Sequence, residues 1–546
     1  MTDCISYEQT KRFKSLFIDY IDQDPKTYPF YNLFPSMDNF KAQIENKRLN
    51  YEPGHRELVV KQLQNQYSNF KLSLSTKKNI NYLLDENTFT ITTGHQLNLF
   101  TGPLYTFYKI ISVINSCKIL NKEYSAYKFV PVFWLASEDH DFEEINFFNI
   151  HSSKFSWDKE VSGAVGEIST EGLESVFKNF KSILPKGKSA DELMSLFKST
   201  YLEHNSLSEA SIFLYNYLFG EEGLIVLEPN HNNLKSTFKS FIKKEVLEKV
   251  TFESVNKTSQ DLKDLNYHEQ VTPREINFFY KTDNLRERII FKDDRYYINK
   301  TDISFSKDEI LFEIESNPDR FSPNSLLRPL YQEVLLPNLS YVGGAGELAY
   351  WLQLKSTFNE FDVIFPMLQM RNSVLVHSEK TRNKLEKIGR SPKELFQSEI
   401  DLKNLHTKEI SEINIDFSVQ KKHLEEQFKA LYKLAEQTDK SFLNAVAAQE
   451  TKQKNGLDKL EKRLLKAERL KLKDELNRLI LLQEKLFPNG NLQERYVNFS
   501  DLYLTYGDSF KSFLLENLDP FNYKFLLIEL STSPKSIPDK FTTDCI

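Results

Sequence analysis

Cysteine is nearly absent from this sequence, with three residues among 546: Cys4, Cys117 and Cys545. They are far apart and odd in number, which suggests neither a disulfide framework nor a cysteine-based zinc site and favours a reducing compartment. Long apolar runs are also missing. No segment reaches the roughly 18 uninterrupted apolar residues that span a bilayer, and the first residues are polar. We therefore predict a cytoplasmic protein without a membrane partner.

An excess of one charge is lacking as well. The 71 basic and 77 acidic side chains give a net charge of −6, which provides no global attraction to nucleic acid or to an anionic membrane. Hydrophobic residues make up 40% and aromatic residues 13% of the chain, enough for packed cores, and a chain of this length should form roughly two to four domains. Glycine is scarce, with 16 residues, so places where glycines gather are informative.

The first such place is the loop between a predicted strand at 88–91 and a predicted helix at 105–119. A strand that breaks at glycine and enters a helix leaves backbone N–H groups free to bind an anion such as phosphate. An ordinary strand–helix connection would show the same pattern. His95 is the candidate catalytic residue of this loop. The candidate ligand-binding residues are Thr93, Gly94, Gln96, Thr101, Gly102 and Lys109.

The next predicted strand, 129–135, is a continuous apolar run that is typical of a strand buried in a parallel sheet. It ends in Glu138, Asp139, His140 and Asp141, our remaining candidate catalytic residues. Because ligands bind beyond the C-terminal ends of such strands, we expect this cluster and the glycine loop to face one crevice.

These four ionisable side chains can bind a divalent metal, supply a general base or hold a substrate ammonium group. A solvated loop, with Asp141 capping the next helix, is the alternative. The spacing matches no dedicated metal site, so we predict no metal.

A third polar loop contains Gly343, Gly344 and Gly346 and precedes a helical pattern. Gly344, Gly346 and Glu347 are candidate ligand contacts, and the rings of Tyr350 and Trp351 could stack on a nucleotide base or a sugar. A tight helix start packed on the sheet would explain the same residues. Other predicted strands lie at 223–227, at 276–298 as hairpins, and at 362–366.

From Leu424 to Leu486 the apolar residues step by three and four, which predicts a coiled coil folded into an antiparallel hairpin. We place its turn at 437–439 rather than at Asn455 and Gly456. The segment 451–473 holds nine basic against three acidic residues, for which a solvated face is the expectation and an RNA groove the alternative.

The predicted organisation has five parts. Residues 1–150 form N-terminal helices and the first half of an α/β core, and 151–320 form an insertion. Residues 321–375 form the second half of the core, 376–487 a helical coiled-coil domain, and 488–546 a segment that returns to the core with a final strand at 523–530.

Five segments carry a family resemblance: TGHQLNLFTGPLYTFYK at 93–109, PVFWLASEDHDFEEIN at 131–146, FSPNSLLRPLYQEVLLP at 321–337, YVGGAGELAYWLQLK at 341–355 and LFPNGNLQER at 486–495. Together, and in this order, they resemble the bacillithiol biosynthesis cysteine-adding enzyme family, also called the cysteine ligases. One departure is His95, where the family pattern has a second glutamine before Gln96.

The resemblance implies a Rossmann-like core with connective-peptide insertions and a homodimer formed through the coiled coil. It implies a ligase that joins the carboxyl group of cysteine to the amine of glucosaminyl-malate. A nucleotide, ATP or ADP, is the suspected cosubstrate, and an adenylate of cysteine is our hypothesis for the activated species.

In that setting Arg328 and Gln332 become candidate substrate contacts, with Arg328 on the malate carboxylates and Glu347 on a ribose or sugar hydroxyl. Two alternatives remain open. One is a nucleotidyl-transfer enzyme that acts on another amine, and the other is a coiled-coil scaffold that binds RNA.

Overall fold

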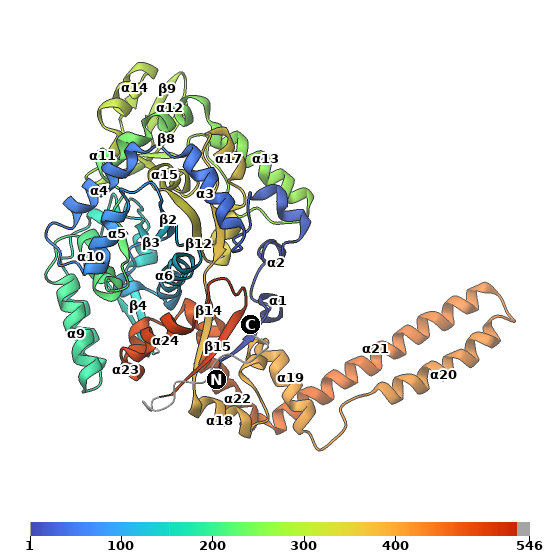
Figure 1. Cartoon of the computed structure of the whole chain (residues 1–546). Coiled ribbons are helices and arrows are strands. Elements are labelled where there is room, and N and C mark those ends of the chain that lie inside the picture. The colour runs from blue at the N-terminus through green and yellow to red at the C-terminus, as the bar shows by residue number, and fades with distance from the viewer. Residues whose placement is uncertain (1, 152, 532–546) are drawn as a thin grey trace. The chain divides into compact units, whose positions relative to one another are not determined.

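The computed structural model describes residues 2–151 and 153–531. The chain divides into two compact units, one made of residues 1–376 with 492–546 and the other of residues 377–491. The elements of both units are labelled in Figure 1.

A five-stranded parallel sheet forms the centre of the larger unit. Its strands, in spatial order, are β13 (Met367–Met370), β12 (Asn338–Gly343), β2 (Thr88–His95), β3 (Lys128–Leu135) and β6 (Ile225–Leu227). The chain builds β2, β3 and β6 across one half of the sheet and then returns to add β12 and β13 on the other side of β2. This strand order is Rossmann-like, with its switch point between β2 and β12. The predicted α/β class is confirmed.

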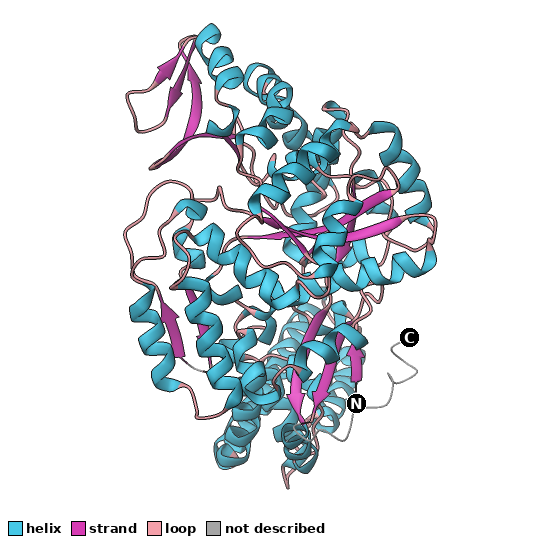
Figure 2. Cartoon of the chain, turned by 60° about the vertical axis from the view of Figure 1, so that its left-hand side comes forward, coloured by secondary structure: helices cyan, strands magenta, loops and turns pink. Residues whose placement is uncertain are grey.

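Strands β2 and β3 are mostly apolar or hydroxyl-bearing, apart from Lys128 at the start of β3 and His95 at the end of β2, and both strands are buried almost throughout. They pair in register, from Thr88 opposite Lys128 to His95 opposite Leu135. Helix α6 (Leu104–Glu123) follows β2 and packs on both strands, and Figure 2 shows helices on both sides of the sheet. The core beneath α6 includes Phe89, Val113 and Val342. Full burial of each such side chain stabilises the fold by about 1.5–3 kcal/mol.

A second, antiparallel sheet is built by the chain between β6 and β12. Its order is β10 (Ser304–Phe305), β9 (Arg295–Ile298), β8 (Leu285–Lys292), β7 (Phe278–Thr282) and β11 (Phe321–Pro323). The hairpins predicted at 276–298 are confirmed, and so is the strand predicted at 223–227, which is β6. Since β6 belongs to the parallel sheet, the segment 151–320 contains a core strand as well as inserted elements. The five-part division stays a prediction.

The strand predicted at 362–366 is wrong in position, because β13 begins only at Met367. Asp362 has a φ of 54° and donates its N–H to Asn359 O in a turn, so the chain becomes extended after this point. Two strands at opposite ends of the chain, β1 (Thr2–Ile5) and β15 (Phe525–Leu530), pair antiparallel, and β14 (Ser373–Ser378) borders β15. The final predicted strand therefore exists, but it joins this small sheet and not the parallel one.

The other elements of the larger unit are mostly helices, including the predominantly helical N-terminal segment that the sequence predicts. They are α1 (Tyr7–Thr10), α2 (Ser15–Ile21), α3 (Asn39–Asn50), α4 (Gly54–Gln66), α5 (Leu74–Tyr82), α7 (Phe142–Ile145), the hairpin β4 (Phe147–Ile150) and β5 (Ser153–Ser156), α8 (Leu173–Ile183), α9 (Lys188–Tyr201), α10 (Leu207–Phe219), α11 (Asn232–Lys235), α12 (Lys239–Glu248), α13 (Val250–Asp264), α14 (Lys307–Ser316), α15 (Arg328–Leu335), α16 (Ala345–Trp351), α17 (Lys355–Glu360), α23 (Phe499–Tyr506) and α24 (Ser509–Asn517).

The smaller unit is helical. It consists of α18 (Glu379–Lys387), α19 (Glu399–Ile410), α20 (Ser418–Ala435), α21 (Lys440–Lys471) and α22 (Lys473–Leu486). Helices α20 and α21 form the predicted antiparallel hairpin, with Leu424, Phe428 and Val446 among its buried residues. Asp439 caps α21 by accepting the N–H of Ser441, so the turn lies where the sequence places it.

Two further findings concern the cysteines and the search for membrane-spanning helices. Cys117 is a free thiol buried under the parallel sheet, whereas Cys545 lies outside the described residues. Within the described parts of the chain, no helix combines the length and the apolar character that crossing a membrane requires.

Candidate active site

The candidate site lies where the strand order reverses, at the C-terminal ends of β2 and β12. A partly buried ion pair joins the two ends, because Lys109 Nζ on α6 lies 2.6 Å from Glu347 Oε2 on α16. The same amino group donates to the carbonyl of Gly94, which is 3.1 Å away. Lys109, which is one of the candidate ligand-binding residues predicted from the sequence, thus reaches back to the end of β2.

Glu347 is fixed by several donors. Besides Lys109, its Oε2 accepts the N–H of Gly344 at 2.8 Å, and its Oε1 accepts the hydroxyl of Tyr341 at 3.0 Å. Burial alone would raise the pKa of Glu347, but Lys109, the Gly344 N–H and His95 lower it to about 2. Burial lowers the pKa of Lys109, and Glu347 opposes that shift. Glu347 is therefore an ionised group with little capacity to act as a base.

His95 is half-buried beside this pair and places its Nε2 3.2 Å from the hydroxyl of Tyr105. Burial and the nearby charges of Lys109 and Arg371 lower the pKa of His95 to about 3, although Glu347 opposes the shift. At neutral pH the imidazole is uncharged, so it can donate or accept a hydrogen bond but does not carry a positive charge for a phosphate.

Arg371 and Glu494 belong to this region but were not candidates from the sequence. Arg371 directly follows β13, and its two Nη atoms each lie 2.8 Å from an oxygen of Glu494 in a buried bidentate pair. The guanidinium also lies 5.8 Å from the centre of the Tyr105 ring. Because the strand is predicted at 362–366 and not at 367–370, the sequence does not place Arg371 directly after a strand end. No sequence pattern near Glu494 marks it as the partner of Arg371.

Arg328, at the start of α15, completes the cationic side of the site. Its Nη1 donates to Gln332 Oε1 at 3.1 Å, and its guanidinium lies 5.6 Å from the Tyr341 ring centre. A Cβ atom on Gly94 would lie 3.5 Å from Arg328 Nη1, so the guanidinium approaches the end of β2 closely. Both Arg328 and Tyr350 are half-buried, which leaves them accessible to a ligand.

The acidic cluster lies beyond β3 and is connected to the glycine loop by Gln96. The Gln96 amide donates to Asp139 Oδ2 at 2.7 Å and to Glu144 Oε2 at 3.0 Å. Although burial alone would raise the pKa of Asp139, hydrogen bonds from His140 and Gln96 and the charge of Arg286 hold it well below its usual value. Asp139 is therefore ionised, and the predicted proximity of the two loops is observed.

The other members of the cluster differ in their surroundings. Glu138 is buried and lies 2.7 Å from the fully buried amino group of Lys235 on α11, so its charge is already paired. His140 is exposed and contacts Arg286 of the inserted sheet. Asp141 is exposed at the start of α7 and makes no capping hydrogen bond through its side chain. In the described part of the chain, no group of three or more His, Cys, Asp or Glu side chains is arranged to hold a metal ion.

The second half of the glycine loop has a structural role. The N–H groups of Phe100 and Gly102 donate to Tyr201 Oη at 2.6 Å and to Leu99 O at 2.9 Å, so they are not free for an anion. Asn498 donates to the carbonyl oxygens of Phe100 and Gly102. Thr101 is buried here as well. The predicted ligand-binding role of Thr101 and Gly102 has no support from these surroundings.

The remaining candidate site residues differ in how much of their surface is exposed. Trp351 has no exposed surface and stacks on Tyr341 at 4.4 Å between ring centres, which leaves no face for a nucleotide base. Thr93 is fully buried, whereas Gly346 is exposed. Gln332 is buried behind Arg328. The structure thus brings together Gly94, His95, Gln96, Lys109, Arg328, Gly344, Glu347 and Tyr350, and it adds Arg371.

Comparison with known proteins places this arrangement in a family. The N-terminal Rossmann-like domain of bacillithiol biosynthesis BshC matches residues 1–372, and its C-terminal coiled-coil domain matches residues 374–530. The chain belongs to the bacillithiol biosynthesis BshC family.

Curated relatives match nearly the whole length of this chain and support its place in the BshC family. A Flavobacterium johnsoniae protein named "Putative cysteine ligase BshC" is 50% identical over 97% of this chain and 100% of its own length. Relatives of the same name from Christiangramia forsetii and Flavobacterium psychrophilum are each 49% identical, over 96% and 97% of this chain and 99% of their own lengths. The resemblance drawn from the sequence is confirmed.

Proposed function

We propose that this chain is a ligase of bacillithiol biosynthesis that joins the carboxyl group of cysteine to the amine of glucosaminyl-malate. The name of its relatives supports the ligase class. The observation that carries the proposal is the presence of two oppositely charged groups at one sheet edge. Arg328 lies beside the end of β2, and Asp139 lies at the end of β3. Lys109 and Arg371 lie nearby, but their charges are paired with Glu347 and Glu494.

Substrates with both carboxylates and amines suit such a site. Arg328 would bind a malate carboxylate through its planar guanidinium. Gln332 would hold the guanidinium in place by accepting a hydrogen bond from its Nη1. Asp139, which is held ionised, would bind the ammonium group of cysteine or accept a proton from the sugar amine. Gln96 would connect the two halves of the site, since its amide already lies on Asp139.

Direct amide formation from a carboxylate and an amine in water is uphill, so the cysteine carboxylate needs activation. A nucleotide would supply the phosphate leaving group for this step. The N–H groups of Phe100 and Gly102 are occupied and Trp351 is covered, so these residues support neither phosphate binding nor stacking of a base. If a nucleotide binds here, we expect side chains to hold its phosphates, and not the helix start of α6.

The test is product formation by the purified chain. Cysteine and glucosaminyl-malate are incubated with ATP, with ADP or without nucleotide, and the amide is detected by mass spectrometry. We expect amide in one nucleotide condition, and cysteine-dependent exchange of pyrophosphate into ATP if an adenylate forms. Failure of the chain to bind either substrate would refute the proposal.

The RNA-scaffold alternative receives no support from the hairpin. Within the basic segment 451–473, Lys454 is paired with Glu425 and Glu450, and Lys471 is paired with Glu412, so part of its basic charge is neutralised within the smaller unit. A homodimer formed through the hairpin and a cytoplasmic location remain part of our proposal.

A further inference from the structure

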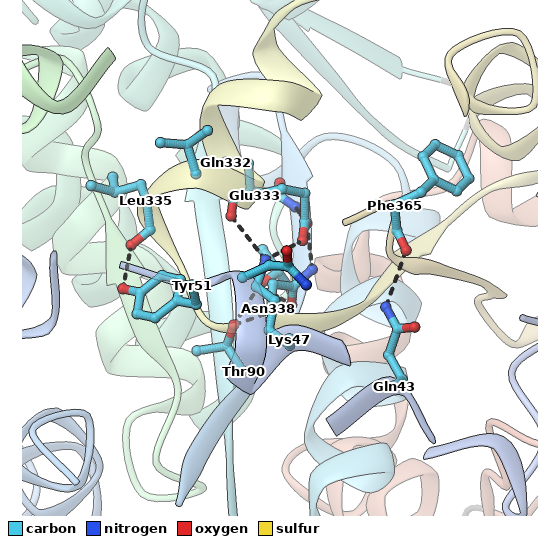
Figure 3. Close-up of polar contacts among 12 residues, drawn as sticks. Gln43, Lys47, Tyr51, Thr90, Gln332, Glu333, Leu335, Asn338 and Phe365 are labelled. Atoms are coloured by element: carbon cyan, nitrogen blue, oxygen red, sulfur yellow. Dashed lines mark hydrogen bonds and ion pairs between the residues drawn. The ribbon is translucent and has the colours of Figure 1, made fainter. Parts of the chain in front are cut away.

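Helix α15, which carries Arg328 at its first position, is fastened at its other end by side chains from the N-terminal helices. The last carbonyls of a helix lack partners within the helix and must find them elsewhere. Here three consecutive carbonyls of α15 are each contacted at 2.9 Å: Glu333 O by Lys47 Nζ, Val334 O by His55 Nδ1 and Leu335 O by Tyr51 Oη. Figure 3 shows Lys47 and Tyr51 reaching this end.

The Glu333 side chain adds a buried polar contact in the middle of this arrangement. Its Oε2 lies 3.2 Å from Lys47 Nζ, and its Oε1 accepts the amide hydrogens of Gln332 at 3.0 Å and of Asn338 at 2.6 Å. Neither Glu333 nor Lys47 is more than 3% exposed at its side chain. Asn338 in turn accepts the hydroxyl of Thr92, which ties the cluster to β2.

These contacts fix which way the Gln332 amide faces. Its NH₂ group is turned to the Glu333 carboxylate, which can only accept, so its oxygen is turned to Arg328. A flipped amide would place an oxygen against the carboxylate and an NH₂ group against the guanidinium, and both contacts would be repulsive. Arg328 and Gln332 are four residues apart, which puts both on one face of α15.

We propose that Glu333 is a positioning residue of this site: it sets the orientation of the Gln332 amide and thereby holds the guanidinium of Arg328 where it contacts the anionic substrate. The ligand side of this inference rests on the proposed function, whereas the positioning side does not. Lys47 balances the buried charge of Glu333 and fastens the same helix turn.

The first experiment is calorimetric titration of the full chain with glucosaminyl-malate. Glu333→Gln removes the charge and leaves a single acceptor oxygen to be shared by Lys47, Gln332 and Asn338, which weakens the orientation of the Gln332 amide. Gln332→Met removes the oxygen that holds Arg328 but keeps the Glu333–Lys47 pair. We expect each variant to raise Kd at least fivefold. In an Arg328→Ala background, Glu333→Gln should raise Kd by less than twofold further, because the group it positions is absent.

Tyr51→Phe is the matched control. It removes a hydrogen bond from the same end of α15 without touching Gln332. It should lower the thermal midpoint while leaving Kd within twofold of the wild type. Equal weakening by Tyr51→Phe, or additive effects of Glu333→Gln and Arg328→Ala, would mean that Glu333 acts only through stability and would overturn the proposal.

A crystal structure of the Gln332→Met chain tests the positioning without any ligand, and it remains informative if Glu333→Gln does not fold. We expect the Arg328 guanidinium to leave its observed place beside the end of β2. An unmoved guanidinium would refute the positioning role. If the wild-type chain does not bind glucosaminyl-malate but Arg328 moves in the variant, the proposed function fails and the positioning role stands.

Discussion

The ion pair of Lys109 and Glu347 shows how single residues determine the charge of the site. Lys109 is almost fully buried and Glu347 is about a quarter exposed, so the pair is held by the fold and stays partly open to solvent. Removing one partner from a buried pair leaves an uncompensated charge, which typically costs about 3–5 kcal/mol.

We predict that Glu347→Gln destabilises the chain by about that amount at neutral pH, with a pH dependence of known sign. Because folding lowers the pKa of Glu347 from 4.5 to about 2, its stabilisation is complete above pH 4.5 and is lost as the pH falls toward 2. Urea unfolding of both proteins between pH 7 and pH 3 should show the difference shrinking below pH 4.5. A constant difference would contradict the assignment.

We predict that His95→Gln preserves substrate binding within about twofold, since a neutral imidazole and an amide are both uncharged hydrogen-bonding groups. The lowered pKa of His95 means that the fold loses stability as the pH falls from 6.5 toward 3, where the unfolded chain binds the proton more readily. NMR of the imidazole carbons between pH 5 and pH 8 should show no titration of His95. A midpoint near 6.5 would disprove this account.

Most polar residues at the site can be predicted from the sequence, but those whose roles depend on burial or on distant partners cannot. Trp351 reads as a stacking surface, yet Tyr341 covers it. Arg371 and Glu494 are 123 residues apart in sequence. Such a pair leaves no local pattern, because only tertiary packing brings the two charges together.

At the level of elements, the loop between β2 and α6 has two halves with different roles. Gly94 lies against Arg328, whereas Gly102 has a φ of 63° and a ψ of −145° in a conformation that is open almost only to glycine. A Cβ atom at Gly102 would lie 2.4 Å from the Asn98 amide nitrogen. The second half therefore holds the loop in shape for the first.

We predict that Gly102→Ala lowers the free energy of unfolding by at least about 2 kcal/mol, from backbone strain and the clash with Asn98. Gly346→Ala is the control, because a Cβ atom there would meet nothing within 4 Å and the position lies in a helix. It should be neutral or stabilising by up to about 1 kcal/mol. Urea denaturation measures both, and equal effects would show that Gly102 is not constrained.

The central elements follow from local pattern, since the runs at 88–91 and 129–135 are buried strands and the repeat after Leu424 is a hairpin. The pattern fails where strands are short and their partners are distant. Strand β1 has four residues and pairs with β15 at the other end of the chain. No periodicity within four residues can reveal such a pairing.

At the scale of the whole molecule, the hairpin exposes apolar side chains that its own two helices do not cover. Leu434 and Phe442 flank its turn and are about half exposed. Surfaces of this kind are typical of sites where proteins associate. They support the proposed homodimer.

We predict that the wild-type chain has about twice its mass of 64.1 kDa in light scattering, and that Leu434→Glu combined with Phe442→Glu shifts it toward the monomer. Both side chains lie at the surface of the hairpin, so circular dichroism should be unchanged. A monomeric wild-type chain at micromolar concentration would refute dimerisation, and an unaffected double variant would place the interface elsewhere.

The proposed reaction requires the two oppositely charged groups of the site, Arg328 and Asp139, to act together. The most direct test is the rate of amide formation from cysteine and glucosaminyl-malate with the supporting nucleotide, compared for the wild type, Arg328→Ala, Asp139→Asn and the control Tyr51→Phe. We predict that both site variants, correctly folded, lose at least a hundredfold while the control keeps the wild-type rate. Wild-type rates in Arg328→Ala and Asp139→Asn would contradict the account.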